Sequence, residues 1–334
     1  MKIAMLAPVA WRTPPRAYGP WELIASLLTE GLVARGHDVT LFATADSVTG
    51  AELDAVAPHG YAEDPGMDGR VWEALHVANA LRRSAEFDLV HSHLDWLPLT
   101  LVEQWQAPLV TTVHGFSDPR ILPAYLAANS NYVSISDSDR ADELSYVATV
   151  HHGIDLSEFS PTRAVGSELV ALGRIHPDKG TEDAIAIAHG AGRRLLVCGP
   201  IADDTYFEER VRPHLDDDRV VYLGTLGPEE RSRVLGSAAA LLHPVRFAEP
   251  FGLVVVEAMA CGTPVIATRR GSMPEIVDEG VTGFLIDSVA EAIAAVPAAV
   301  ALDRRIVRET AERRFGVARM VDGYLAVYRE ILAR

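Results

Sequence analysis

Two glutamates, Glu249 and Glu257, stand eight positions apart in the segment AEPFGLVVVEAMACGTPV, which is otherwise almost wholly apolar. Burying an unpaired carboxylate costs several kcal/mol in effective terms, so two acids in such a run are expected to serve a ligand. A Pro-Phe-Gly break at residues 250–252 separates the first glutamate from a run of helix-forming residues that carries the second. This break predicts that a helix starts between the two acids.

The backbone N–H groups of Phe251, Gly252 and Leu253 are expected at this helix N-terminus, where they and the helix dipole attract an anion such as phosphate. From Gly252 to Glu257 a helix rises ~7–8 Å, which is too far for two carboxylates to share a proton. The spacing suits a ligand with phosphate in its middle and hydroxyl groups at both ends. A carboxylate accepts two hydroxyl protons well, so the pattern favours a ligand built from sugar, diphosphate and ribose.

Two cations stand on another short connection, GRIHPDKGT, where Arg174 and Lys179 follow a predicted strand and precede a predicted helix. Their order does not match a Walker A loop, and no G-x-G-x-x-G follows the first strand. On a loop at the carboxyl end of a strand, the pair could clamp a diphosphate or could simply be solvated surface charges. His114 ends an apolar β run just before Gly115, so it is either a functional side chain or a structural, hydrogen-bonded histidine.

The first part of the chain has the pattern of a parallel α/β sheet. Strands are predicted at residues 2–8, 37–44, 87–93, 108–115 and 132–136, with helical runs between them. The first helix is predicted from Pro20 to Arg35, with proline at its start and Gly36 just beyond its end. In such a sheet, ligands gather at the carboxyl ends of the strands.

The same pattern starts again after residues 151–161, with strands predicted at 167–174, 193–200, 219–224, 239–244 and 263–268. We therefore expect an N-terminal Rossmann-like domain over residues 1–152. A C-terminal Rossmann-like domain is expected over residues 153–316. The last helix, within residues 317–334, is expected to cross back to the N-terminal domain. Two doubly wound domains that face each other would leave an interdomain cleft for a small ligand.

Composition excludes several classes of protein. The 334 residues are 49% apolar and 23% charged, which is typical of a soluble globular protein with about two domains. A net charge of −16 argues against a nucleic-acid partner, and acidic side chains far outnumber basic ones in residues 1–152, which disfavours anionic membranes. With two cysteines and no long apolar segment, we expect a cytoplasmic protein without strong membrane attachment.

The order and spacing of several motifs resemble those of the family-4 retaining glycosyltransferases, which have the GT-B fold of two facing Rossmann-like domains. The resemblance covers nearly the whole chain. It is carried by AYGPWE, ARGHDVTLFAT, VTTVHG, HHGIDLSEFSP, GRIHPDKG, EPFGLVVVEAMACGTPVIA and PEIVDEGVTGFLI. Glu249 and Glu257 match the Glu-x7-Glu motif of that family. The resemblance implies that residues 1–152 form the acceptor-side domain and residues 153–316 the nucleotide-sugar donor domain.

The resemblance implies a role for each matching residue of the donor site. Glu249 would hold hydroxyl groups of the donor sugar, while the amides of residues 251–253 would contact the donor near its sugar and phosphates. Glu257 would bind the ribose. Arg174 and Lys179 would stabilise the diphosphate as negative charge builds on the leaving group.

Further roles are implied for the N-terminal loop and for the base. His114 would lie by the donor sugar, Gly19 would let the first loop approach the phosphates, and backbone near Leu226 would meet the nucleobase. Pro20 replaces the usual second glycine of that loop and removes an N–H group. The loop could instead line the acceptor site with Tyr18 and Trp21. Val245 and Ser272 also depart from the family pattern, without an expected loss of function.

The expected activity is that of a retaining hexosyltransferase that uses a nucleotide-diphosphate sugar. UDP-glucose is the first expected donor and GDP-mannose the second, and the acceptor is expected to be a soluble small molecule or saccharide. No cofactor or metal is expected, because the cations and the helix dipole would stabilise the leaving group. The alternatives are a sugar-nucleotide epimerase and a non-catalytic nucleotide-sugar-binding protein on the same fold.

Overall fold

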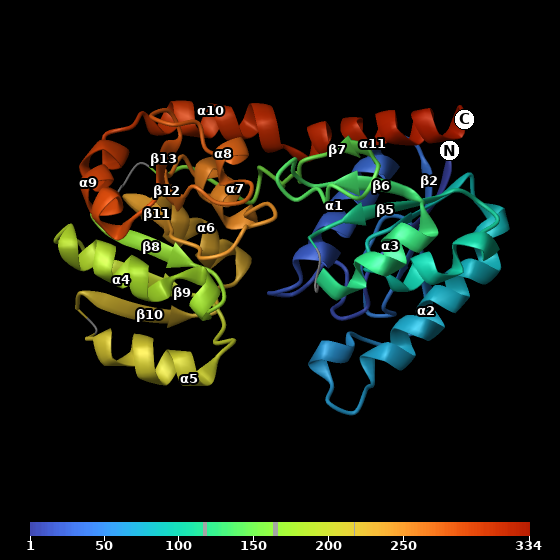
Figure 1. Ribbon diagram of the computed structural model, residues 1–334, viewed down its shortest axis with the longest axis horizontal. Helices are drawn as coiled ribbons and strands as arrows, with labels where there is room; N and C mark the ends of the chain where they lie inside the picture. Colours follow the sequence, from blue (N-terminus) through green and yellow to red (C-terminus); the bar gives the residue numbers. More distant parts are fainter. Residues whose placement is uncertain (116–118, 163–165, 217) are drawn as a thin grey trace. The chain divides into compact units, whose positions relative to one another are not determined.

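The computed structural model describes residues 1–115, 119–162, 166–216 and 218–334. Within them the chain forms two compact units (Figure 1). The first unit comprises Met1–Gly153 together with Val317–Arg334, and the second comprises Ile154–Gly316. Each unit is built on one parallel sheet, as its alternation of strands and helices predicts.

The sheet of the first unit has seven strands in the order β3-β2-β1-β4-β5-β6-β7. Adjacent strands are parallel throughout, with β1 between β2 and β4. The order reverses between β1 and β4, which is the position where open α/β sheets bind ligands. The strands are β1 (Lys2–Leu6), β2 (Asp38–Ala43), β3 (Glu52–Ala55), β4 (Leu89–Ser92), β5 (Leu109–Val113), β6 (Asn131–Ser134) and β7 (Tyr146–Thr149).

The helices of this unit include α1 (Pro20–Ala34), which begins at a proline and follows Gly19 as its N-cap. Proline at the first position costs no hydrogen bond, since that N–H group has no partner within the helix. Burial of one face of α1, including Ile24, Leu28 and Leu32, fixes the helix on the unit. The other helices are α2 (Gly69–Arg83), α3 (Leu122–Ala128) and α11 (Val317–Leu332), with short 3-10 turns at Tyr61–Glu63, Ser84–Glu86, Leu97–Gln104 and Pro119–Ile121.

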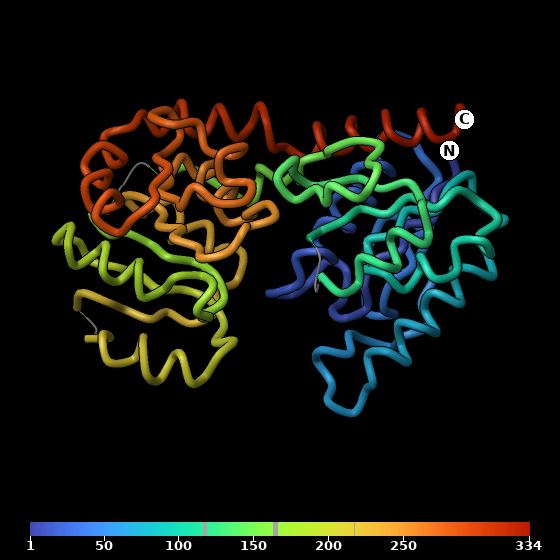
Figure 2. Tube along the Cα trace, viewed as in Figure 1, coloured from blue at the N-terminus to red at the C-terminus, as the bar shows by residue number. Residues whose placement is uncertain are grey.

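Helix α11 completes the first unit although it comes after the whole second unit in the sequence (Figure 2). It packs against α1, and Tyr324 and Tyr328 are fully buried. The hydroxyl of Tyr328 lies 2.6 Å from Nδ1 of His91 on β4, and that of Tyr324 lies 2.7 Å from Oγ1 of Thr112 on β5. These bonds satisfy polar groups that would otherwise be buried without partners.

The sheet of the second unit has six parallel strands in the order β10-β9-β8-β11-β12-β13, and its order reverses between β8 and β11. An apolar core of strand and helix side chains surrounds it, with α4 and α9 packed together. The strands are β8 (Leu169–Leu172), β9 (Leu195–Cys198), β10 (Val220–Gly224), β11 (Ala240–His243), β12 (Val265–Thr268) and β13 (Gly283–Ile286). The helices are α4 (Thr181–Gly190), α5 (Asp204–Tyr206), α6 (Pro228–Ser237), α7 (Leu253–Ala260), α8 (Met273–Ile276), α9 (Val289–Val300) and α10 (Arg304–Phe315).

All ten strands predicted from the sequence are present, and the last helix spans Val317–Leu332. Three further strands, β3, β7 and β13, were not predicted. In the described parts of the chain, none of the helices is both long and apolar enough to cross a membrane. The fold is therefore that of two Rossmann-like units with parallel sheets.

Candidate active site

The predicted donor-binding residues of the second unit gather where its strand order reverses. Arg174 lies on the loop after β8, and His243 is the last residue of β11, the strand beside β8. Arg174, Lys179 and His243 line one small cavity of about 20 Å³. Two segments about 70 residues apart in sequence thus meet at one end of the sheet, as the parallel topology requires.

Lys179 and Glu249 form an ion pair at the centre of this group. Nζ of Lys179 donates to Oε2 of Glu249 at 2.5 Å, and both side chains are largely buried. The same ammonium lies 4.6 Å from the ring centre of Phe247, where a cation–π contact adds to its stabilisation. Nε2 of His243 lies 3.5 Å from Oε2 of Glu249, at the outer limit of a hydrogen bond.

Glu249 is held in its ionised form. Burial alone would raise the pKa of this carboxyl, but the imidazole of His243 and the charge of Lys179 outweigh burial and lower the pKa to about 2. A carboxylate that stays ionised and oriented at neutral pH is a strong acceptor for hydroxyl protons. The geometry thus suits Glu249 to binding the hydroxyl groups of a sugar.

The loop before α8 supports the backbone of Glu249. The N–H group of Ser272 donates to the carbonyl of Glu249, and its Oγ donates to the carbonyl of Phe251, both at 2.9 Å. Gly271 has φ +55°, and a Cβ there would lie 2.4 Å from the backbone N and O of Glu249. Ser272, which departs from the family pattern, thus anchors the segment that carries the carboxylate.

The helix that carries Glu257 begins where the sequence predicts. Helix α7 starts at Leu253, with Gly252 as its N-cap at φ +82° and without a side-chain cap. Phe251 is buried, and its ring meets that of Phe315 edge to face at 6.1 Å between centres. The first N–H groups of the helix have no capping side chain, so the position retains the anion-binding character expected of it.

Glu257 is buried within α7 and has a cationic partner. Nη1 of Arg231, from α6, lies 3.4 Å from Oε1 of Glu257. Burial raises the pKa of this carboxyl, and the charge of Arg231 opposes that increase. Arg231 also lies over the ring of Phe159, at 5.8 Å from its centre. Burial thus shifts the pKa of Glu257 upward, whereas the pKa of Glu249 is shifted downward.

Arg174 and Leu226 differ in exposure. Arg174 is partly exposed, and no ion pair joins it to another described residue, so its charge remains available to an anion. Leu226 lies on the connection between β10 and α6, and its side chain is buried. Only its backbone could meet a base, which is the role that the sequence resemblance implies.

Four histidines form a buried cluster in the first unit. Nδ1 of His93 lies 2.9 Å from Nε2 of His114, and Nδ1 of His114 lies 3.3 Å from Nε2 of His152. The ring of His91 lies 4.4 Å from that of His93. These residues come from β4, from the ends of β4 and β5, and from the segment after β7. The sheet therefore brings together histidines that are up to about 60 residues apart in sequence.

His114 is neutral within this cluster. Burial, together with the nearby His152 and His93, holds the pKa of His114 well below its ordinary value. Burial also lowers the pKa values of His93 and His152 to about 3. Trp21 stacks on His114 with 5.2 Å between ring centres. His114 is thus an uncharged hydrogen-bonding group with a fixed orientation.

The loop before α1 places its residues around a carboxylate that the sequence analysis did not single out. Glu22, in the first turn of α1, is buried and accepts a hydrogen bond from the backbone N–H of Trp11 at 3.2 Å. Its Oε2 lies 3.0 Å from where a Cβ at Gly19 would be. Pro20 is the first helical residue, and Tyr18 is exposed on the loop.

Sequence reasoning missed His93, His152, His243 and Glu22 because each contacts the predicted residues only through the fold. His93 stands in HSHLD at the end of a predicted strand, His152 in HHGIDLSEFSP and Glu22 in AYGPWE, but none of these motifs shows the contacts that the residues make. Among the described residues, no group of three or more His, Cys, Asp or Glu side chains has an arrangement that could hold a metal ion. The expectation of a metal-free reaction stays a prediction.

Comparison with known proteins identifies the class. The model of the glycosyl transferases group 1 matches residues 162–314, and that of glycosyltransferase family 4 matches residues 24–158. A solved glycosyltransferase involved in avilamycin A biosynthesis is 25% identical, with a TM-score of 0.75, and the match covers 100% of this chain and 98% of that one. The fold is therefore the GT-B fold of glycosyltransferases.

Two further proteins show the same likeness. The D-inositol 3-phosphate glycosyltransferase of Saccharomonospora viridis is 31% identical, and the match covers 76% of this chain and 72% of that protein. The Anabaena protein HepE, solved in complex with UDP and glucose, is 20% identical, with a TM-score of 0.73, and the match covers 99% of this chain and 100% of that one. The chain belongs to glycosyltransferase family 4, and it is an enzyme of the hexosyltransferase class.

Proposed function

We propose that this enzyme transfers a hexose from UDP-glucose to a soluble acceptor with retention at the anomeric carbon. The observation that carries the proposal is the ion pair of Lys179 and Glu249 beside the uncapped N-terminus of α7. It combines a carboxylate for sugar hydroxyls with cationic and dipolar groups for phosphates. UDP and glucose in the HepE structure support this donor, with GDP-mannose as the second candidate.

In the proposed reaction, the acceptor hydroxyl attacks the anomeric carbon from the face that the diphosphate leaves. The bond from that carbon to the phosphate oxygen breaks, a bond to the acceptor oxygen forms, and the acceptor proton passes to the departing diphosphate. Arg174 and Lys179 stabilise the negative charge that builds on the leaving group. Because these groups supply the stabilisation, we propose that no metal or other cofactor is needed.

The remaining residues have proposed roles that follow the family pattern. Glu257, with Arg231 beside it, binds the ribose hydroxyls, and the backbone near Leu226 meets the base. His114 acts as a neutral hydrogen-bonding group toward the sugar. Gly19 allows the loop before α1 to approach the phosphates, and Tyr18 and Trp21 serve the acceptor. A cytoplasmic location agrees with the two unpaired, buried cysteines.

Calorimetry with UDP, GDP and ADP, each with EDTA and with magnesium, tests the donor site. We expect UDP to bind at micromolar concentration without metal, and UDP-glucose to release UDP only when an acceptor is present. Binding that requires magnesium would contradict the metal-free proposal. Conversion of UDP-glucose to another sugar nucleotide without an acceptor would instead identify an epimerase, and binding without any turnover would identify a non-catalytic binding protein.

A further inference from the structure

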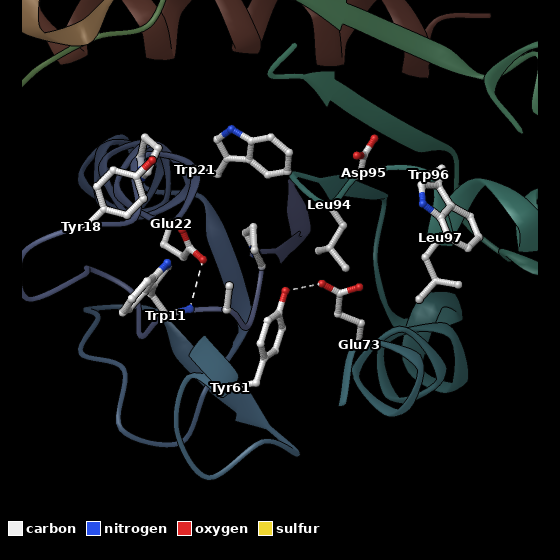
Figure 3. A pocket seen from close by; sticks show the side chains of 13 residues that line it. Trp11, Tyr18, Trp21, Glu22, Tyr61, Glu73, Leu94, Asp95, Trp96 and Leu97 are labelled. Carbon is white, nitrogen blue, oxygen red and sulfur yellow. Dashed lines mark hydrogen bonds between the residues drawn. The ribbon is translucent and has the colours of Figure 1, made fainter. Parts of the chain in front are cut away.

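The first unit contains a cavity of about 480 Å³ that the donor proposal does not use (Figure 3). It lies where the strand order reverses between β1 and β4. The loop after β1 provides one wall and the loop after β4 provides another. Open α/β sheets bind ligands at this position, so both the topology and the hollow indicate a site. Its volume can hold one to a few rings of the size of a sugar.

Aromatic rings dominate the wall of the cavity. Trp11, Tyr18 and Trp21 lie on one side, and Tyr61 and Trp96 line other parts of the wall (Figure 3). Tyr18 and Trp96 are 41% and 42% exposed, although large aromatic side chains gain free energy from burial. Flat rings that remain accessible inside a concave site present apolar faces to a ligand. The C–H faces of a sugar or polyol ring are well suited to pack on them.

Carboxylates supply the polar part of the wall. Glu22 is buried and accepts from the N–H of Trp11, and Oε1 of Glu73 accepts from the hydroxyl of Tyr61 at 2.7 Å. Asp95 accepts from the hydroxyl of Tyr125 at 2.6 Å. Carboxylates fixed by such bonds are good acceptors for ligand hydroxyl groups.

Among the described residues, the wall of the cavity has no group that could become positive. None of the described residues that line the cavity is a lysine, arginine or histidine. Burial raises the pKa of Glu22 to about 7 and also raises that of Glu73, so protonation can make the wall less negative but never cationic. A phosphate in the cavity would lose hydration, meet carboxylates and find no counter-charge among the described lining residues.

We infer that this cavity binds the acceptor and that the acceptor ring it holds is an unphosphorylated sugar or polyol. The inference rests on the proposed transferase function and adds the chemical class of its acceptor. Aromatic faces and carboxylates recognise the ring and its hydroxyl groups, and the lack of a cationic lining side chain among the described residues excludes an anionic substituent. An inositol or hexose ring would therefore be accepted free and rejected as its phosphate.

Intrinsic fluorescence of the full-length enzyme can test this assignment. The five tryptophans, Trp11, Trp21, Trp72, Trp96 and Trp105, all belong to the first unit, and three of them line the cavity. The probes are two matched pairs, myo-inositol with inositol 3-phosphate and glucose with glucose 6-phosphate. We expect the free ring of at least one pair to saturate the fluorescence change and its phosphate to bind at least ~30-fold more weakly.

Variants connect this binding to the cavity. Trp96→Ala should abolish the saturable change and the transfer to the same ring, while Trp72→Ala, at a tryptophan on α2 outside the cavity, should keep both. Glu73→Gln keeps the size of the side chain and the hydrogen bond from Tyr61. It should reduce the ratio of the affinities for the free and the phosphorylated ring by ~threefold or more. All three variants should bind UDP as the wild type does.

Two results would overturn the inference. One is equal or tighter binding of the phosphorylated member of a pair, and the other is no saturable binding of any free ring while UDP-glucose still binds. Both leave the donor proposal standing, because UDP binding is measured separately by calorimetry. If free rings bind but UDP-glucose does not, the proposed transferase function is contradicted, while the assignment of the cavity as a sugar-binding site is supported.

Discussion

The ion pair of Lys179 and Glu249 is the contact that most clearly indicates the chemistry of the site. The sequence motifs identify Lys179 and Glu249 separately as candidate site residues. No sequence pattern shows that these two side chains, 70 positions apart, are in contact. The pair exists because β8 and β11 are neighbours in the sheet. The sequence therefore predicted which residue types the site uses, and the fold was needed to show their ionisation and partners.

Removing the charge of Glu249 should reduce turnover more than nucleotide binding. Glu249→Gln loses charge-assisted bonds to sugar hydroxyls, worth ~1.5–3 kcal/mol, so kcat/KM for UDP-glucose should fall about tenfold to over a hundredfold. Affinity for UDP alone, measured by calorimetry, should change by less than ~threefold, since UDP has no hexose. Glu229→Gln, at an exposed carboxylate in the first turn of α6, is the control. Normal turnover by the Glu249 variant would contradict the proposed role of this residue in binding the donor sugar.

Arg174 should discriminate between a nucleotide and a nucleoside. The charge of Arg174 has no ion-pair partner among the described residues. Arg174→Ala should therefore lower the affinity for UDP by ~tenfold or more and the affinity for uridine by less than ~twofold. Competition against UDP-glucose turnover measures both affinities in one assay. Equal weakening of UDP and uridine would mean that Arg174 shapes the loop and does not bind phosphate.

At the scale of elements, apolar composition decided which strands could be predicted. The ten predicted strands are runs of β-branched and aliphatic residues that end in polar residues or glycine, and most of them are buried on both faces. The missed strand β3 reads ELDA and lies at the edge of its sheet, where one side has no partner strand. Strands β7 and β13 are also edge strands. Strands β3 and β7 have no fully buried residue, which weakens their apolar pattern. Position at an edge is not the whole reason, because the edge strand β10 was predicted and β13 was missed although three of its four residues are buried.

The loop before α8 should control both the stability and the activity of the second unit. Gly271→Ala places a methyl group against the backbone of Glu249 and adds the strain of a positive φ, so we expect a loss of at least ~2 kcal/mol in unfolding free energy. Gly280→Ala is the matched control, because φ is +72° there and nothing lies within 4 Å of the added methyl. It should lose only about 1 kcal/mol. Urea unfolding and kcat of both variants check this, and equal losses would contradict the role of the loop.

At the scale of the whole molecule, the buried histidines link stability to pH. His91, His93, His114 and His152 are buried and neutral, with pKa values far below the 6.5 of an exposed imidazole. The unfolded chain binds protons below pH 6.5 that the native cluster cannot bind. The stability from these groups is therefore complete above about pH 6.5 and is lost as the pH falls toward the folded pKa values.

Mild acid should thus destabilise the first unit before most of its carboxylates titrate; Glu22, whose pKa burial raises to about 7, is an exception. Each buried histidine should cost about 1 kcal/mol per pH unit below 6.5, so urea midpoints followed by tryptophan fluorescence should fall steeply between about pH 6.5 and pH 5. Since all five tryptophans belong to the first unit, this signal reports that unit alone. His189→Gln, at an exposed histidine of α4, should leave the dependence unchanged. A flat profile over this range would show that the cluster does not stay neutral.

The late position of α11 in the sequence affects how the protein forms during synthesis. The residues that complete the core of the first unit, including Tyr324 and Tyr328, leave the ribosome only after all of the second unit has been made. Until then the strands β4 and β5 lack the partners of His91 and Thr112, and the face that α1 turns to α11 is open. The second unit is continuous in sequence and can fold as it emerges, whereas the first must wait. A nascent chain of this enzyme therefore carries an incomplete first unit, with the α11-facing side of α1 uncovered, until its last residues have been made.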